Sequence, residues 1–214
     1  MNITVTLTSD FVCPWCFIGE RRLQQAIRNL AQDIQVTLVW QPYELNSTMP
    51  VEGVDRTSYR IKKFGSLEYS QMLDQRIVAA SANDDIHFNH AAILKTPNTF
   101  KAHRLMGWAR QFAKTDDLAN ALFSGYFEHG RDIGDSNVLA EIAAEIGLDS
   151  AQALAFLNSD ADVLQTRQAI AQVVDIQGVP NFDIDGEIIS GAHPVSIIQN
   201  ALQDAAARKR GQQD

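Results

Sequence analysis

The chain lacks any long hydrophobic run. No stretch of its 214 residues approaches the roughly 18 consecutive apolar residues that a membrane-spanning helix needs. Its first residues also lack the basic start, apolar core and small-residue cleavage site of a secretory signal. We therefore expect a soluble, cytoplasmic protein without a membrane partner.

An excess of positive charge is also missing. The chain has 26 acidic and 18 basic residues, and its formal net charge is −8 at pH 7. Proteins with a general affinity for nucleic acid neutralise phosphates with Lys and Arg, so we expect no nucleic-acid partner. The basic cluster at residues 208–210 is explained more simply as the C-terminal turn of a helix, where cations are favoured.

Cysteine is the scarcest chemical group, with two residues in the chain. A second cysteine pair that could complete a zinc site is absent, and the five histidines show no ligand spacing near the pair, so we expect no metal. A lone pair in a reducing compartment is also not expected to form a permanent structural disulfide. The cysteines are therefore candidates for redox catalysis, and a binding protein that has lost the activity is the alternative.

The two cysteines form the motif Cys13-Pro14-Trp15-Cys16. Thiol exchange needs a thiolate, and an ordinary cysteine with a pKa of about 8.5 supplies only a small fraction of it at neutral pH. The backbone N–H groups and the positive dipole end at a helix N-terminus stabilise a thiolate. Because Cys13 lies at the predicted helix start, we assign it as the nucleophile, and Cys16, one turn further, as the resolving thiol.

The hydrophobic pattern predicts an α/β protein in three parts. Residues 3–8, the helix from the motif to about residue 30, and residues 35–40 form a β-α-β unit. A helical block follows, and then a helix, a hairpin with an Asp185-Gly186 turn, and a last helix from Pro194. The predicted helices of the block are residues 59–80, 99–112, 117–126, 138–146 and 151–157.

This order resembles a thioredoxin fold with a large all-helical insertion between the β-α-β and β-β-α halves. The expected thioredoxin-like domain comprises residues 1–57 and 160–214, and the helical insertion comprises residues 58–159. In such a layout, the loop before the hairpin lies against the Cys-x-x-Cys helix. A cis Val179-Pro180 bond there would leave backbone groups of the loop available to pair with an extended peptide, so we predict that this bond is cis.

Four segments carry a resemblance to a known family. They are SDFVCPWCFIG at residues 9–19, PNTFKAHR at 97–104, GVPNF at 178–182 and ISGA at 189–192. Together they resemble the DsbA-like thioredoxin superfamily, specifically its FrnE-type branch, over nearly the whole chain. The resemblance implies that Pro180 is the active-site cis proline. It also implies that Asn98, Thr99 and His103 lie near the catalytic face as candidates for substrate contact, although an Asn-Thr helix start followed by a packed His is the structural alternative.

The resemblance implies a thiol-disulfide oxidoreductase or disulfide isomerase. Its expected partners are disulfide-containing proteins or glutathione, with no resident cofactor, and the sequence leaves the oligomeric state open. Pro14, Trp15 and Val179 are predicted to contact the substrate. Two alternatives are a glutathione-dependent isomerase or transferase of the 2-hydroxychromene-2-carboxylate isomerase or kappa type, which typically has Ser at the first active-site position, and a non-catalytic, chaperone-like peptide-binding protein.

Overall fold

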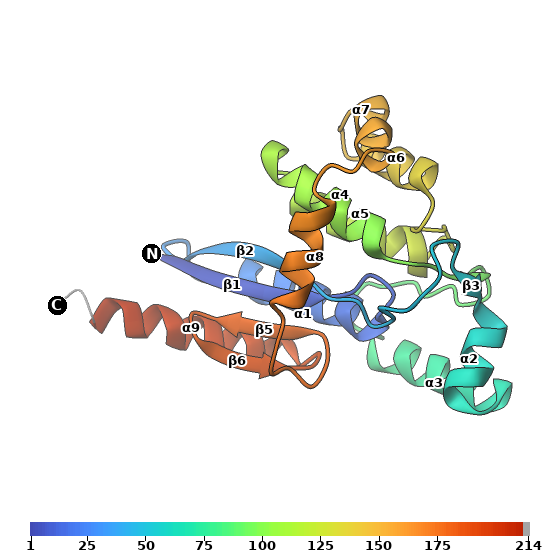
Figure 1. The fold of residues 1–214 in the computed structure, drawn as a ribbon. Helices are drawn as coiled ribbons and strands as arrows, with labels where there is room; N and C mark the ends of the chain where they lie inside the picture. Colours follow the sequence, from blue (N-terminus) through green and yellow to red (C-terminus); the bar gives the residue numbers. More distant parts are fainter. Residues whose placement is uncertain (212–214) are drawn as a thin grey trace.

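The computed structural model describes residues 1–211, and its main sheet has the strand order β2-β1-β5-β6 (Figure 1). Strand β1 pairs in parallel with β2 and antiparallel with β5, and β5 pairs antiparallel with β6. The four strands are β1 (Asn2–Ser9), β2 (Gln35–Pro42), β5 (Asn181–Ile184) and β6 (Glu187–Ser190).

Two helices complete the β-α-β and β-β-α halves. Helix α1 (Pro14–Arg28) connects β1 to β2, and helix α9 (Val195–Gly211) follows β6 and packs against α1, β1 and the hairpin. Ile3, Val5 and Leu7 alternate along β1 and are fully buried, as one core-facing side of a strand requires. The expected thioredoxin fold is confirmed, as is the hairpin, where Asp185 and Gly186 both have positive φ.

A helical insertion separates the two halves, as expected. Its elements include a two-stranded sheet, formed by β3 (Val54–Asp55) and β4 (Lys95–Thr96), and a short 3-10 helix at Arg110–Phe112. The block and the helix that leads back to the sheet comprise β3 (Val54–Asp55), α2 (Arg56–Phe64), α3 (Leu67–Ala80), β4 (Lys95–Thr96), α4 (Phe100–Ala109), α5 (Thr115–Phe127), α6 (Ser136–Glu145), α7 (Ser150–Leu157) and α8 (Val163–Ala171). The division of the chain at residues 57 and 160 stays a prediction.

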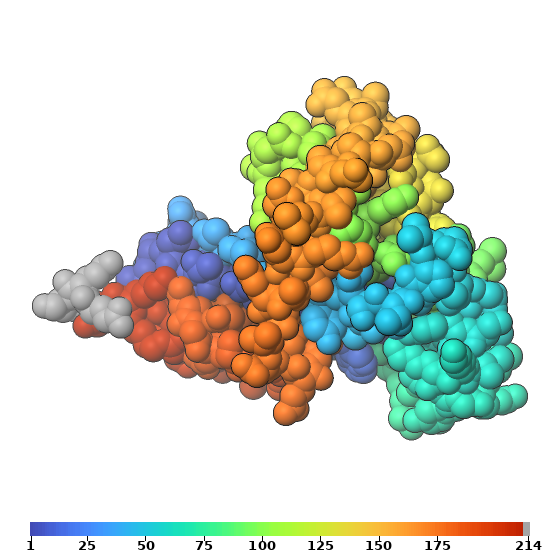
Figure 2. Space-filling view, viewed as in Figure 1, coloured from blue at the N-terminus to red at the C-terminus, as the bar shows by residue number. Residues whose placement is uncertain are grey.

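The predicted single helix over residues 59–80 is wrong, because the chain forms two helices there. Gly65 ends α2 in a conformation with φ of +94°, which favours glycine. Ser66 then caps α3, its hydroxyl accepting a hydrogen bond from the Tyr69 backbone N–H at 3.1 Å. The two helices form a lobe at the opposite end of the molecule from the N-terminus (Figures 1 and 2).

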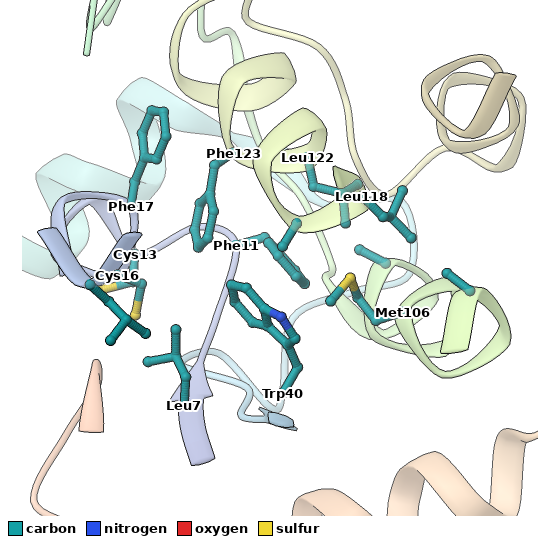
Figure 3. Close-up of a cluster of buried hydrophobic side chains, with 14 of the residues drawn as sticks. Leu7, Phe11, Cys13, Cys16, Phe17, Trp40, Met106, Leu118, Leu122 and Phe123 are labelled. Atoms are coloured by element: carbon teal, nitrogen blue, oxygen red, sulfur yellow. The ribbon is translucent and has the colours of Figure 1, made fainter. Parts of the chain in front are cut away.

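Aromatic side chains join the sheet to the helical insertion. Figure 3 shows Phe123 of α5 between Phe17 of α1 and Phe11, which precedes the cysteine motif. The Phe123 ring centroid lies 5.2 Å from that of Phe17 and 5.0 Å from that of Phe11. Trp40 of β2 extends this group and donates from Nε1 to Asp116 Oδ1 at 2.7 Å. The helix that carries the cysteines is therefore packed on both parts of the molecule.

Candidate active site

Helix α1 begins directly after Cys13. Cys13 is its N-cap, with an extended backbone conformation, and Pro14 opens the first turn, where its missing N–H breaks no helical hydrogen bond. Both cysteines are free thiols. Cys13 is 5% exposed, whereas Cys16 has no exposed surface. The structure thus places the two thiols as the sequence predicts, with the first at the helix end and the second sheltered one turn inside.

The loop before β5 lies against Cys13. The Cys13 thiol donates to the Val179 carbonyl oxygen at 3.6 Å, and the Val179-Pro180 peptide bond is cis, as predicted. A Cβ atom added to Gly19 of α1 would lie 2.9 Å from Pro180 Cγ and 3.1 Å from Phe182 Cζ. The lack of a side chain at Gly19 therefore allows α1 and the proline loop to come into close contact.

Cys16 is held as a neutral thiol by its surroundings. Burial raises the pKa of Cys16 well above its usual range, and the neighbouring Cys13 raises it further, while the Ser9 hydroxyl opposes this rise. A thiol that keeps its proton is a weak nucleophile until a reaction brings an electrophilic sulfur to it. This behaviour suits a resolving thiol.

Pro14 and Trp15 lie on the open side of the motif. Trp15 is exposed, and together with Pro14 and Val12 it lines a cavity of about 440 Å³. The opposite side of the cavity is formed by residues of α2 and α3, including Tyr59 and Phe64. The sequence contains no pattern that indicates this cavity, because its two sides come from segments more than 40 residues apart.

Asn98 and Thr99 lie at the start of α4. The Asn98 side chain donates to the Met49 carbonyl oxygen at 2.8 Å and accepts from the Phe100 backbone N–H at 3.0 Å. Thr99 is buried and is the N-cap of α4, but its side chain makes no capping hydrogen bond. The Asn98 amide is thus used within the protein, and the role of both residues in substrate contact stays a prediction.

His103 lies behind the motif rather than on the surface. Its ring is buried, with Nε2 3.4 Å from Asp10 Oδ1 and its centroid 5.2 Å from that of Phe11. The other carboxylate oxygen of Asp10 accepts from the Leu45 backbone N–H at 2.8 Å, and the Asp10 carbonyl accepts from the Cys13 backbone N–H at 3.0 Å. A role of His103 in substrate contact stays a prediction, and its observed contacts are with the turn that carries Cys13.

Asp10 is a site residue that the sequence interpretation missed. It lies in the short connection between β1 and α1, directly after the last residue of the strand. The acidic side chain three residues before Cys13 was the available signal. Its link to His103 could not be inferred, because the two residues meet only when α4 packs beside the end of β1.

Glu20 of α1 is a second buried acid, after Asp10. Burial raises the pKa of Glu20 from 4.5 to about 7, and Arg21 partly opposes this effect. Neither of its carboxylate oxygens has a hydrogen-bond partner in the described part of the chain. A carboxyl group in such surroundings is more stable with its proton attached.

Two further features are absent from residues 1–211. No group of three or more His, Cys, Asp or Glu residues is arranged to hold a metal ion there. No helix in the same residues is both long and apolar enough to cross a membrane.

The geometry is accompanied by a match to a known protein family. The family model described as a DSBA-like thioredoxin domain matches residues 4–203. The chain belongs to this family. It is 26% identical over 212 residues to the uncharacterized protein YwbO of Bacillus subtilis, covering 98% of this chain and all of that protein.

Two solved structures share this fold over nearly the whole chain. The crystal structure of a probable DsbA oxidoreductase from Streptomyces coelicolor matches with a TM-score of 0.87 at 26% identity, covering 96% of this chain and 90% of that one. A 2-hydroxychromene-2-carboxylate isomerase matches with a TM-score of 0.74 at 15% identity, covering 99% of both chains. The second likeness shows a shared fold alone. The chain is therefore a DsbA-like protein whose structural relatives include an oxidoreductase and an isomerase.

Proposed function

We propose that this DsbA-like protein is a thiol-disulfide oxidoreductase or disulfide isomerase of the FrnE type. The observation that carries the proposal is the placement of Cys13 at the start of α1, with its sulfur against Val179 and with the fully buried Cys16 one turn behind it. Exchange through a mixed disulfide needs one accessible and one sheltered thiol in this relation. The protein is proposed to act in the cytoplasm on disulfide-containing proteins or glutathione, without a resident cofactor.

The proposed reaction transfers two electrons between the dithiol and a substrate disulfide. The Cys13 thiolate attacks one substrate sulfur, the substrate S–S bond breaks, and the departing sulfur takes up a proton. Cys16 then loses its proton and attacks Cys13 Sγ, which releases the second substrate thiol and leaves a Cys13–Cys16 disulfide. Run in reverse, the same steps oxidise a substrate dithiol.

The residues around Cys13 would hold the substrate during this exchange. Backbone groups of Val179 and Pro180 are proposed to pair with an extended peptide, and Pro14 and Trp15 are proposed to contact the residues beside its cysteine. Asn98, Thr99 and His103 are proposed to act from the α4 side. The contact of His103 with Asp10, three residues before Cys13, supports this proposal. In these steps only S–S and S–H bonds break and form.

Trapping the mixed disulfide tests the proposal. Cys16→Ser should accumulate covalent adducts in cells, because the first attack proceeds and the release does not, whereas Cys13→Ser should accumulate none. Adducts are separated on non-reducing gels and identified by mass spectrometry. A set of protein adducts on Cys16→Ser supports the proposal. Absence of adducts, together with inactive parent protein in insulin reduction and in refolding of a scrambled disulfide substrate, would favour the peptide-binding alternative.

The glutathione-dependent isomerase or transferase is less well supported by this site. Such an enzyme activates glutathione with one residue and has no use for a resolving thiol. Here Cys16 is packed within the helix as a free thiol, and burial raises the pKa of Cys16 well above its usual range. Glutathione as the sole adduct of Cys16→Ser would nevertheless favour that alternative.

A further inference from the structure

The cavity beside Trp15 has an unusual charge for this protein. The chain has a net charge of −8, yet the cavity is lined by Arg56, Arg60, Lys63 and Arg76. One carboxylate, Asp74, lines it with them. A concave site with several cations creates a positive local potential even on an acidic protein, and this potential attracts anions.

The single carboxylate is shared by two of the cations. Asp74 lies 2.9 Å from the Arg56 guanidinium and 2.7 Å from that of Arg60. Arg60 also donates to the Ser70 backbone carbonyl at 2.8 Å. These contacts hold both guanidinium groups in the lining of the cavity, and they neutralise at most one of the two charges.

The other two cations have no acidic partner. Within residues 1–211, neither Lys63 nor Arg76 forms an ion pair with a carboxylate. Lys63 Nζ instead donates to the Tyr59 hydroxyl at 2.9 Å, and Arg76 contacts Met72 Sδ at 3.8 Å. Both side chains can therefore bind an anionic group without first breaking an ion pair.

Aromatic rings and the cysteine motif complete the cavity. Tyr59 and Phe64 line it beside the cations, and Pro14 and Trp15 line it next to the dithiol. A volume of about 440 Å³ lies within the range of small-molecule sites. The cavity thus combines space for a small ligand, charges that favour carboxylates and a position adjacent to Cys13.

We propose that this cavity binds one half of a low-molecular-weight disulfide that bears carboxylate groups, and that it presents the S–S bond to Cys13. The inference rests on the proposed function. Cys13 attacks the bound disulfide and releases one small thiol, and Cys16 then releases the second, so that one small disulfide becomes two thiols and the protein dithiol becomes a disulfide. The small disulfide is the oxidant, and one turnover of the reduced protein needs no other reagent.

Charge-matched probes test the proposal. The fully reduced protein is mixed with oxidised glutathione, with neutral bis(2-hydroxyethyl) disulfide or with cationic cystamine, and the loss of free protein thiols is followed by rapid alkylation and mass spectrometry. Oxidised glutathione should react faster than the other two. Lys63→Gln or Arg76→Gln should each lower the rate with oxidised glutathione roughly threefold, and the double variant should lower it about tenfold. Each substitution removes one cation that would bind a carboxylate of the disulfide. The rate with the neutral disulfide should change much less than the rate with oxidised glutathione, because the neutral disulfide has no carboxylate for these cations to bind.

A neighbouring lysine provides the matched control. Lys62 is exposed in the same helix as Lys63 but does not line the cavity. Lys62→Gln removes the same net charge and should leave all three rates unaltered. Equal rates for the three disulfides, or equal losses for the Lys62 and Lys63 variants, would overturn the proposal while leaving the oxidoreductase function intact. Failure of the parent protein to react with any of the three would instead contradict the proposed function.

Discussion

The two cysteines of the motif differ in how exposed they are, and burial raises the pKa of Cys16. Cys13 is slightly exposed at the start of α1, while burial gives Cys16 a raised pKa and no accessible surface. We predict that a small alkylating reagent at neutral pH modifies Cys13 at least about tenfold faster than Cys16. Time-resolved alkylation of the reduced protein with peptide mass mapping measures the two rates. Preferential modification of Cys16 would contradict the assigned roles.

The buried Glu20 carboxyl group should make the free energy of unfolding depend on pH. Its pKa is about 7 in the folded protein against 4.5 when unperturbed, so the folded state holds the proton to higher pH than the unfolded chain. Between these values folding loses stability as pH rises. Glu20→Gln, which stays uncharged, should therefore match the parent near pH 4.5 and gain about 3 kcal/mol in free energy of unfolding by pH 8.

Urea unfolding at several pH values measures this difference. Glu52 is exposed, and Glu52→Gln is the matched control, for which no comparable pH-dependent gain is expected. A gain for Glu20→Gln that is the same at pH 5 and pH 8 would show that packing, rather than the buried charge, is responsible.

At the scale of elements, one arginine holds the connection between α7 and α8. The Arg104 side chain is buried and donates to the backbone carbonyls of Phe156, Leu157, Ser159 and Ala161 at 2.6–3.2 Å. Lysine keeps the charge but cannot reproduce this forked set of donors. Arg104→Lys should therefore lower the free energy of unfolding by about 2–3 kcal/mol, since it leaves buried carbonyl groups unpaired.

The control for this change is an exposed arginine. Arg28 lies in the last turn of α1, and Arg28→Lys is expected to change stability by less than about 0.5 kcal/mol. Denaturant titrations of both variants measure the difference. Equal effects would show that the carbonyl contacts of Arg104 contribute little to stability.

The elements also show what a sequence can and cannot predict. The strands and the hairpin were found because their apolar residues alternate and because Asp185-Gly186 suits a tight turn. The break at Gly65 was missed because apolar positions continue at helical spacing on both sides of it. The short pair β3 and β4 has two residues per strand, which is too few to show any periodicity.

Some residues of the candidate site could be predicted from the sequence, and others could not. Cys13, Cys16 and Pro180 follow from local spacing and from the order of elements. The Asp10–His103 contact and the cationic cavity do not, because each joins residues that are brought together only by packing of the helical insertion. The reactive residues of a motif can thus be predicted from the sequence, whereas the residues that surround the motif in the folded protein cannot.

For the whole molecule, the aromatic contacts predict cooperative unfolding. Phe123 of α5 is fully buried between Phe11 and Phe17, so it connects the helical insertion to the cysteine helix. Phe123→Ala should lower the free energy of unfolding by about 3–5 kcal/mol. Tryptophan fluorescence and the reactivity of Cys16 should report the same transition midpoint, because the two parts unfold together.

Phe112 supplies the comparison. It is 40% exposed, and Phe112→Ala should cost clearly less than Phe123→Ala. Two separate transitions in the parent protein, with Cys16 reacting before or after the change in fluorescence, would show that the sheet and the insertion are independently stable.

Gly19 has a consequence for what other sequences can form this site. A glycine within a helix lowers the helix stability by about 1 kcal/mol relative to alanine. Here the missing side chain allows Pro180 to lie closer to α1 than a single methyl group would permit. A related chain could keep both cysteines and the proline and still fail to bring the loop to the first sulfur, if any side chain occupied this position. A redesign of the site, or a search for functional relatives, can therefore use as its criterion one carbon atom that must be absent.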